Sequence, residues 1–205
     1  MRTILIFGAK GGVGKTTLAR ELGVASAMAG RKVALADLDP QAGLTGWYGR
    51  RAADTPVMVN LPPGYDLGQL VDTGLDELII DLPPGLPTYV ATLIRQVDAV
   101  LVPCRPSPDD LTAASGAVHA LEQHPRWAFV LTQTLPRSRL SDGAVRQLAT
   151  LGRIAPGSLG LRQDYPLAAI EGQAAVEFPG TKSAEDVKQL RSYADKLAGF
   201  DVEEA

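Results

Sequence analysis

The residues of this chain with the clearest chemistry form one glycine-rich string near the amino terminus, Lys10-Gly11-Gly12-Val13-Gly14-Lys15-Thr16-Thr17. Glycines let a backbone approach phosphates closely and adopt positive φ, and a helix that begins directly afterwards adds unpaired N–H groups and a favourable dipole. In such a loop we expect Lys15 to reach the β and γ phosphates of a nucleotide and Thr16 to bind Mg²⁺. The general Walker pattern has glycine where this chain has Ala9, so the string fits a variant of that pattern. A turn without a ligand is the alternative.

Three aspartates follow apolar runs of the strand type. These are Asp37, Asp39 and Asp81, and the chain after Asp81 continues Leu82-Pro83-Pro84-Gly85. Ligands of an open parallel sheet lie beyond the carboxyl ends of its strands, where the glycine-rich loop is also expected. An aspartate after a strand is often only a helix cap or a turn former. Beside a phosphate-binding loop, we interpret all three as parts of one nucleotide site.

The elements that must position these residues follow from apolar runs and amphipathic stretches. Continuous apolar runs predict strands at residues 4–7, 33–36, 78–80, 99–102 and 128–131. Amphipathic stretches predict helices at residues 15–29, 44–51, 88–95, 109–123, 140–151 and 183–197, the last opened by a capping box of Ser183 and Asp186. The proline-rich residues 55–64 have room for one short strand and a turn. Because strands covered on both faces are apolar throughout, we predict an α/β fold with a mostly parallel sheet flanked by helices on both faces.

Length and composition narrow the choice of protein class. The 205 residues have room for a single domain, residues 1–205, with its own hydrophobic core. A formal net charge of -3 gives no general attraction to nucleic acid, so any DNA-binding surface must be a local patch. The one cysteine, Cys104, cannot form an intrachain disulfide and favours a reducing cytoplasm. No apolar run reaches the roughly 20 residues that a membrane-spanning helix needs.

The string from Lys10 to Thr17, residues 37–41 and residues 81–85 together resemble the ParA/MinD family of deviant-Walker ATPases. Residues 103–109 are similar to the family's Pro-x-x-Pro-Ser segment, and later positions resemble small ParA proteins, namely Arg162, Tyr165, Gly172, Val176 and Glu177. The resemblance spans nearly the whole chain. It is closest to small ParA-type partition or positioning ATPases without a helix-turn-helix domain, because the first predicted strand begins at about residue 3. It implies a P-loop NTPase fold of the deviant Walker type.

The resemblance also implies cofactors, ATP and Mg²⁺, and a role for each candidate residue. Lys10 would be the signature lysine that reaches the ATP of a partner subunit, so that nucleotide binding and dimerisation become one event. Asp39 would position the attacking water, Asp37 would hold the magnesium shell, and Asp81 would be the Walker B carboxylate. The γ-phosphate would be sensed by the switch Pro83-Pro84-Gly85.

By the same resemblance, the protein is a slow ATPase that partitions or positions a cargo such as a plasmid, a chromosome region or a protein cluster. Its ATP-bound homodimer would bind the nucleoid without sequence preference, and an adaptor protein would stimulate hydrolysis. We expect Arg162, Lys188 and Arg191 to contact DNA, because the predicted last helix turns Lys188 and Arg191 away from its apolar stripe. Ordinary solvated charges are the alternative for these three residues. The expected location is the cytoplasm, on the nucleoid.

Other members of the wider class give alternatives. A MinD-like ATPase would end in a basic amphipathic helix, whereas residues 200–205 of this chain are acidic and an anionic membrane would repel them. A P-loop enzyme of the dethiobiotin synthetase type would act on a small molecule without ATP-induced dimers. Nitrogenase-type iron proteins need two cysteines per subunit, and this chain has one. The adenine-contacting residues stay open, because Thr132 and Gln133 stand where many relatives have asparagine.

Overall fold

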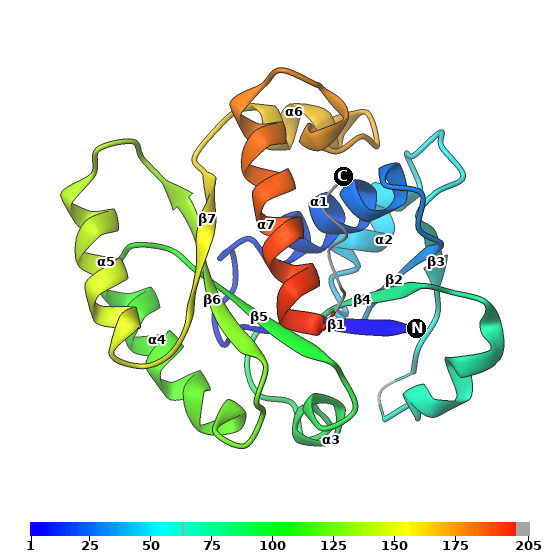
Figure 1. The fold of residues 1–205 in the computed structure, drawn as a ribbon, viewed down its shortest axis with the longest axis horizontal. Coiled ribbons are helices and arrows are strands. Elements are labelled where there is room, and N and C mark those ends of the chain that lie inside the picture. The colour runs from blue at the N-terminus through cyan, green and yellow to red at the C-terminus, as the bar shows by residue number, and fades with distance from the viewer. Residues whose placement is uncertain (63, 200–205) are drawn as a thin grey trace.

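The computed structural model describes residues 1–62 and 64–199, which form one parallel seven-stranded sheet (Figure 1). Its order across the sheet is β3-β2-β4-β1-β5-β6-β7, and every neighbouring pair is parallel. The strands are β1 Arg2–Ile6, β2 Val33–Asp37, β3 Val57–Val59, β4 Glu77–Asp81, β5 Ala99–Cys104, β6 Trp127–Thr134 and β7 Ile154–Gly160. The predicted fold class is therefore confirmed.

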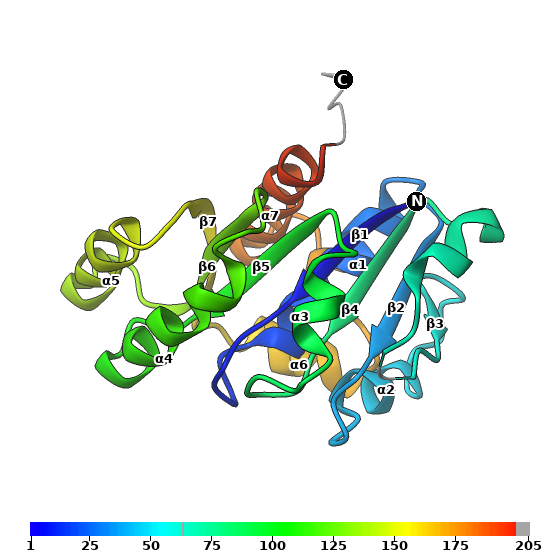
Figure 2. The same cartoon turned by 90° about the horizontal axis from the view of Figure 1, so that it is seen from below.

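Helices cover both faces of the sheet (Figures 1 and 2). One face packs against α1 Lys15–Met28, α2 Gly43–Tyr48, α6 Asp164–Ile170 and α7 Lys182–Ala198, and the other against α3 Val90–Ile94, α4 Pro108–Val118 and α5 Arg139–Ala149. Short 3₁₀ turns complete the element list, namely η1 Leu67–Thr73, η2 His119–Leu121 and η3 Ala175–Glu177. Successive residues of a strand point to opposite faces, so Ile4 joins the first core and Leu5 the second. This two-sided burial explains the continuous apolar runs.

Two elements near the carboxyl-terminal end are absent from the sequence prediction. β7 contains Pro156 and Gly157, which weaken a strand pattern, but it is an edge strand, where both residues are tolerated. α6 is only seven residues long and carries Pro166 in its first turn, so it has no helical periodicity to detect. Residues 55–64 hold the one short strand, β3, for which the sequence left room.

The last predicted helix is present, but its predicted capping box is wrong. Thr181 is the N-cap of α7, and its side chain accepts a hydrogen bond from the Ala184 N–H. Ser183 instead lies inside the first turn and donates to the carboxylate of Asp164, while Asp186 pairs with Arg162. Thr181, two positions before Ser183, is the N-cap because its backbone is extended, with φ of -84° and ψ of 149°, as an N-cap residue requires.

None of the described helices combines the length and the apolar character needed to cross a membrane. The acidic residues 200–205, on which the argument against a membrane-binding helix depended, lie outside the described residues.

The segment that follows α6 is attached to α2 by close contacts. The Trp47 indole N–H donates to the Gln173 carbonyl oxygen at 3.0 Å, and Arg51 makes two hydrogen bonds of 3.0 Å to the Glu177 carboxylate. Between them, Gly172 adopts a φ of 68°, and a Cβ built on it would lie 2.3 Å from backbone atoms of Arg50. Only glycine fits this position, because the neighbouring atoms are the backbone of Arg50 and Arg51 just after α2 and not the end of a flexible side chain.

We therefore expect Gly172→Ala to lower the melting temperature by on the order of 5 °C or more, since it adds a backbone clash to an unfavourable φ. Gly116→Ala is the matched control, because nothing lies within 4 Å of its Cβ position on α4. That variant should melt at the same temperature as wild type or higher, as alanine favours a helix. Thermal unfolding followed by circular dichroism tests both, and equal melting temperatures for the two variants would contradict the packing argument.

Candidate nucleotide-binding site

The glycine-rich loop joins the end of β1 to the start of α1. Gly12 and Gly14 have φ of 73° and 92°, and Gly14 is the N-cap of α1 without any side-chain cap. The first N–H groups of α1 are therefore available to an anion. Thr132 supports the loop, because its hydroxyl donates to the Val13 carbonyl at 2.7 Å and its methyl group packs beside Gly14.

Lys15 is folded back over this loop. Its side chain is buried, and its ammonium group donates to the carbonyl oxygen of Lys10 at 3.0 Å. Burial lowers the pKa of Lys15, and the carboxylates of Asp81 and Asp39 oppose that shift. It lines a cleft of about 390 Å³ whose other walls are Gly11, Gly12, Gly14, Thr16, Thr17, Asp39, Gln41, Pro84 and Gln133. A cation with three donors at the floor of a cleft opposite helix N–H groups is suited to phosphate oxygens.

Asp81 lies at the end of β4 under the loop. It is fully buried, and one of its carboxylate oxygens accepts a hydrogen bond of 2.6 Å from the Thr16 hydroxyl. The other oxygen has no hydrogen-bond partner. Burial raises the pKa of Asp81 to about 7, a shift that the Thr16 hydrogen bond opposes and the nearby Asp37 carboxylate reinforces.

An unpartnered buried oxygen beside a threonine hydroxyl fits a divalent cation. Thr16 and Asp81 are the residues that would hold Mg²⁺. Among the described residues no cluster of three or more His, Cys, Asp or Glu side chains could hold a metal by itself. The remaining ligands of such an ion would therefore be phosphate oxygens and water, as is usual for Mg²⁺.

Asp37 and Asp39 lie at the end of β2, next to Asp81. Asp37 pairs with Asp81 in the β2–β4 register, and its carboxylate accepts bonds from the N–H and hydroxyl groups of Thr45 at 2.8 and 3.0 Å. Asp39 lines the cleft, and one of its oxygens accepts the Gln41 N–H at 2.9 Å. The structure thus brings together all three aspartates that the sequence assigned to one site, although Asp37 also orders the start of α2.

The segment after Asp81 contacts the start of the loop. The Gly85 N–H donates to the Ala9 carbonyl oxygen at 2.9 Å, Gly85 has a φ of 96°, and Pro84 lines the cleft. The proposed switch Pro83-Pro84-Gly85 therefore lies where a change at the phosphate end of the cleft would reach it.

Lys10 lies outside the cleft. Its ammonium group is 3.0 Å from an oxygen of the buried Asp110 and 3.9 Å from the exposed Asp109. Burial alone would raise the pKa of Asp110, but hydrogen bonds from Arg105, Ser107 and Lys10 outweigh it and lower the pKa to about 2. Lys10 also borders a groove of about 370 Å³ that continues over Leu135, Leu140 and Leu161. Sequence inspection gave no sign of Asp110 as a partner of Lys10.

A second hollow, of about 280 Å³, adjoins the cleft. The two share Gly14, Thr17 and Gln133, and the second is closed by residues 159–162, Tyr165 and Pro166. Gln133 has a φ of 52° and donates its side-chain amide to the Gly12 carbonyl oxygen at 2.9 Å. The undetected α6 therefore supplies part of the wall where the rest of a nucleotide would extend, and Gln133 lies between the two hollows.

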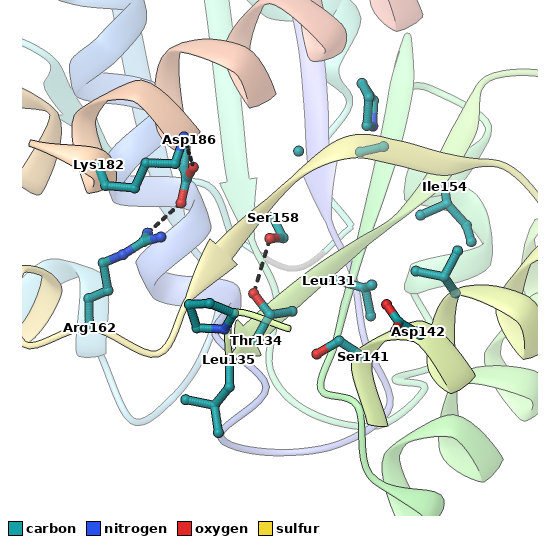
Figure 3. Close-up of a pocket in the computed structure, with 15 residues that line it drawn as sticks. Leu131, Thr134, Leu135, Ser141, Asp142, Ile154, Ser158, Arg162, Lys182 and Asp186 are labelled. Atoms are coloured by element: carbon teal, nitrogen blue, oxygen red, sulfur yellow. Dashed lines mark hydrogen bonds and ion pairs between the residues drawn. The ribbon is translucent and has the colours of Figure 1, made fainter. Parts of the chain in front are cut away.

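None of the three predicted DNA-binding residues lines the cleft, although Arg162 borders the second hollow, and two of the three are ion-paired. Arg162 pairs with Asp186, which also lies 3.4 Å from the Lys182 ammonium group (Figure 3). Arg191 pairs with Asp195 at 3.0 Å, and Asp195 also binds Arg31. Lys188 is exposed on α7, with no ion-pair partner among the described residues. Of the three, Lys188 alone keeps an uncompensated charge.

A glycine-rich phosphate loop between the first strand and the first helix, with carboxylates at the ends of two adjacent parallel strands, defines a P-loop nucleotide-binding protein. Residues 4–199 match the CobQ/CobB/MinD/ParA nucleotide binding domain, so the chain belongs to this family. The ParA and MinD members of the family are ATPases. The resemblance seen in the sequence is confirmed.

Several similar proteins are known. The chain is 30% identical to maintenance of carboxysome distribution protein A of Halothiobacillus neapolitanus, over 92% of this chain and 94% of that protein. It is also 30% identical to a probable plasmid-partitioning protein ParA of Thermus thermophilus, over 92% of this chain and 53% of that protein. An ATP complex of McdA from Cyanothece has a TM-score of 0.78 at 20% identity, covering 100% of this chain and 99% of that chain. MinD of Aquifex aeolicus has a TM-score of 0.76 at 19% identity, covering 96% and 98%.

The raised pKa of Asp81 predicts a pH trend in the metal-free protein. The unfolded chain releases this proton near pH 4, whereas the folded protein keeps it to about pH 7. Ionisation of Asp81 therefore reduces stability as the pH rises from about 4 to 7. With EDTA present, the melting temperature of Asp81→Asn relative to wild type should increase by on the order of 5 °C between about pH 5 and pH 8. A difference that stays constant over this range would show that Asp81 is not the buried acid described above.

Proposed function

We propose that this protein is a Mg²⁺-dependent ATPase whose ATP-bound form is a homodimer, and that it partitions or positions a cargo on the nucleoid. An adaptor protein would stimulate the hydrolysis that ends each cycle. The observation that carries the proposal is the separation of the two loop lysines. Lys15 lines the cleft, whereas the Lys10 side chain points into the neighbouring groove and is 36% exposed.

Because of this separation, Lys15 would bind the nucleotide of its own subunit and Lys10 the nucleotide of a partner subunit. Lys15, the N-terminal N–H groups of α1 and Thr16 already supply the cations and donors for a nucleotide bound in the cleft of the same subunit. Lys10 is not needed there, and its groove is lined by residues that follow β5 and β6, at the carboxyl ends of the strands. A second subunit that brings its own phosphates to this edge would meet Lys10.

Dimerisation then requires Lys10 to leave Asp110. The exchange does not strand a buried charge, because the Asp110 carboxylate keeps two hydrogen bonds from Arg105, at 2.7 and 3.2 Å, and one from Ser107 at 2.6 Å. ATP brings more negative charge than ADP to compete for the lysine. The ion pair of the single subunit therefore favours the monomer until ATP is present on the partner.

The hydrolytic step depends on residues already placed around the cleft. Mg²⁺ held by Thr16 and Asp81 would neutralise charge that develops on the β and γ phosphates. Lys15 donates to the same oxygens from the floor of the cleft. Asp39, oriented by the Gln41 N–H, is the carboxylate that would align the attacking water. Phosphoryl transfer passes through a loose transition state, so Asp39 would act mainly by positioning the water.

The proposal that this protein has a cargo rests on analogy with its relatives. The named relatives include a protein for maintenance of carboxysome distribution and a probable plasmid-partitioning protein, so their names give two different cargoes. We propose that one nucleotide cycle serves either kind of cargo, with an ATPase that holds the nucleoid in one nucleotide state and releases it in another. We extend that cycle, and not either cargo, to this chain.

Lys10→Ala should lose the ATP-dependent dimer while still binding ATP as a monomer, because the cleft keeps Lys15. Lys32→Ala is the matched control, since Lys32 is exposed directly before β2, at the amino ends of the strands and away from the cleft. Light scattering with ADP, ATP and a non-hydrolysable analogue measures the mass. One and the same mass for wild type in all three nucleotides would refute the dimer proposal.

Asp39→Ala should keep ATP binding and dimerisation yet lose turnover by about 100-fold or more, because removal of a water-orienting group leaves the phosphate contacts intact. Lys15→Ala should instead weaken binding itself. Titration with a fluorescent ATP analogue and phosphate-release assays separate the two effects. Turnover at the wild-type rate in Asp39→Ala would assign the water to another residue.

A further inference from the structure

The segment around α5 is strongly basic, although the chain as a whole is acidic. Residues 137–153 contain four arginines and one acidic residue, Asp142, whereas the whole chain has a formal net charge of -3. The arginines are Arg137, Arg139, Arg146 and Arg153, and all four are exposed. The charge of this segment is therefore a local feature and not a reflection of composition.

The arginines of this segment keep their charge available to solvent. Within residues 1–62 and 64–199, no ion pair involves any of the four, and the one hydrogen bond from Arg153 goes to the neutral Pro125 carbonyl oxygen. Arg162 and Arg191, by contrast, are paired with Asp186 and Asp195. A polyanion should bind the four unpaired arginines more tightly than Arg162 and Arg191, because it does not have to displace a carboxylate from them.

The geometry of α5 presents these charges in a row. Arg139 and Arg146 are seven positions apart, which places them on the same side of the helix at roughly 10 Å. α5 forms one end of the molecule, and no other element lies outside it (Figures 1 and 2). Arg137 directly precedes the N-cap Ser138, so a third arginine lies at the start of the helix, whereas Arg153 lies beyond its end and donates to the Pro125 carbonyl oxygen. A long straight ligand can lie along this row.

Duplex DNA fits this surface better than a membrane does. An amphipathic helix binds a bilayer by inserting its apolar side, but Ala144 and Leu148 of α5 are 1% and 0% exposed because they pack against the sheet. Leu140 and Val145 remain 67% and 41% exposed, but they are five positions apart and lie on opposite sides of the buried stripe, so α5 exposes no continuous apolar side. The side that carries Arg139, Asp142 and Arg146 is charged. Arginines without carboxylate partners bind the phosphates of DNA and read no sequence.

We infer that the arginine row of residues 137–153 is the surface by which this protein holds duplex DNA, in place of Arg162, Lys188 and Arg191, which were expected from the sequence. The inference rests on the proposed function, because ATP dependence would come from the dimer. Ser138 and Leu140, at the start of α5, line the same groove as Lys10. Each α5 therefore begins beside the proposed dimer face, and dimerisation would join two rows into one longer site with higher avidity.

The test is a double variant on α5, Arg139→Gln with Arg146→Gln, measured in the full chain with a non-hydrolysable ATP analogue. Binding to a random-sequence duplex is followed by fluorescence anisotropy over a series of salt concentrations. The variant removes four phosphate contacts from a dimer, so the slope of log affinity against log salt should become shallower by about 3.6. At low salt, the affinity itself should fall by at least roughly tenfold. Lys32→Gln with Arg95→Gln removes the same charge from exposed positions elsewhere and should change both values little.

Two further measurements separate this inference from the proposed function. Light scattering should show that the α5 variant still dimerises with the ATP analogue, which also shows that it is folded. A wild-type protein that fails to dimerise would refute the proposed function by itself. If the dimer forms but the α5 variant binds DNA like wild type, or if Lys188→Gln removes binding and the α5 variant does not, the arginine row is not the DNA surface. Binding of wild type to anionic phospholipid vesicles but not to DNA would overturn the inference in the same way.

Discussion

The candidate site depends on the parallel register of three central strands. Ile6 of β1 and Asp37 of β2 both pair with Asp81 of β4, so the start of the glycine-rich loop and two carboxylates meet at one level of the sheet. The hydrogen bond from Thr16 to Asp81 then joins the loop helix to this edge. A shift of one residue in β4 would turn Asp81 to the other face of the sheet and remove both contacts. The apolar cores on the two faces prevent such a shift.

A buried ion pair connects the loop helix to the last third of the chain. Arg20 and Glu21 of α1 are both buried, the Glu21 carboxylate accepts the N–H groups of Ala175 and Val176, and Arg20 donates to the Tyr165 carbonyl oxygen. Burial raises the pKa of Glu21, and the adjacent Arg20 opposes this shift. The wall of the second hollow, which includes Tyr165, is thereby fixed to the helix that carries Lys15 and Thr16.

Ion pairs decide which cations of this protein can act on a ligand. On α7, Asp186 and Asp195 neutralise Arg162 and Arg191, and the same Asp195 holds Arg31. The Arg162 pair joins α7 to the segment after β7, the Arg31 pair joins it to the segment after α1, and the Arg191 pair lies within α7. Lys10 is an intermediate case, because its partner Asp110 has other donors that can replace it. The arginines near α5 have no such partners among the described residues, so their charge is the least compensated.

The sequence by itself determined the phosphate loop, the three aspartates after strands and the two-faced parallel sheet, because each rests on local signals. Glycines in a fixed string, carboxylates at strand ends and unbroken apolar runs keep their meaning in any P-loop fold. Only the tertiary structure decided three other features. These are the elements β7 and α6, which contain prolines, the partner of Lys10, and the pairing of Arg162 with Asp186. Lys10 and Asp110 are 100 residues apart in the chain, whereas the residues of the phosphate loop are consecutive. Arg162 and Asp186 are 24 positions apart. An ion pair between distant segments depends on how helices pack on the sheet, and nothing in the local pattern of either segment records it.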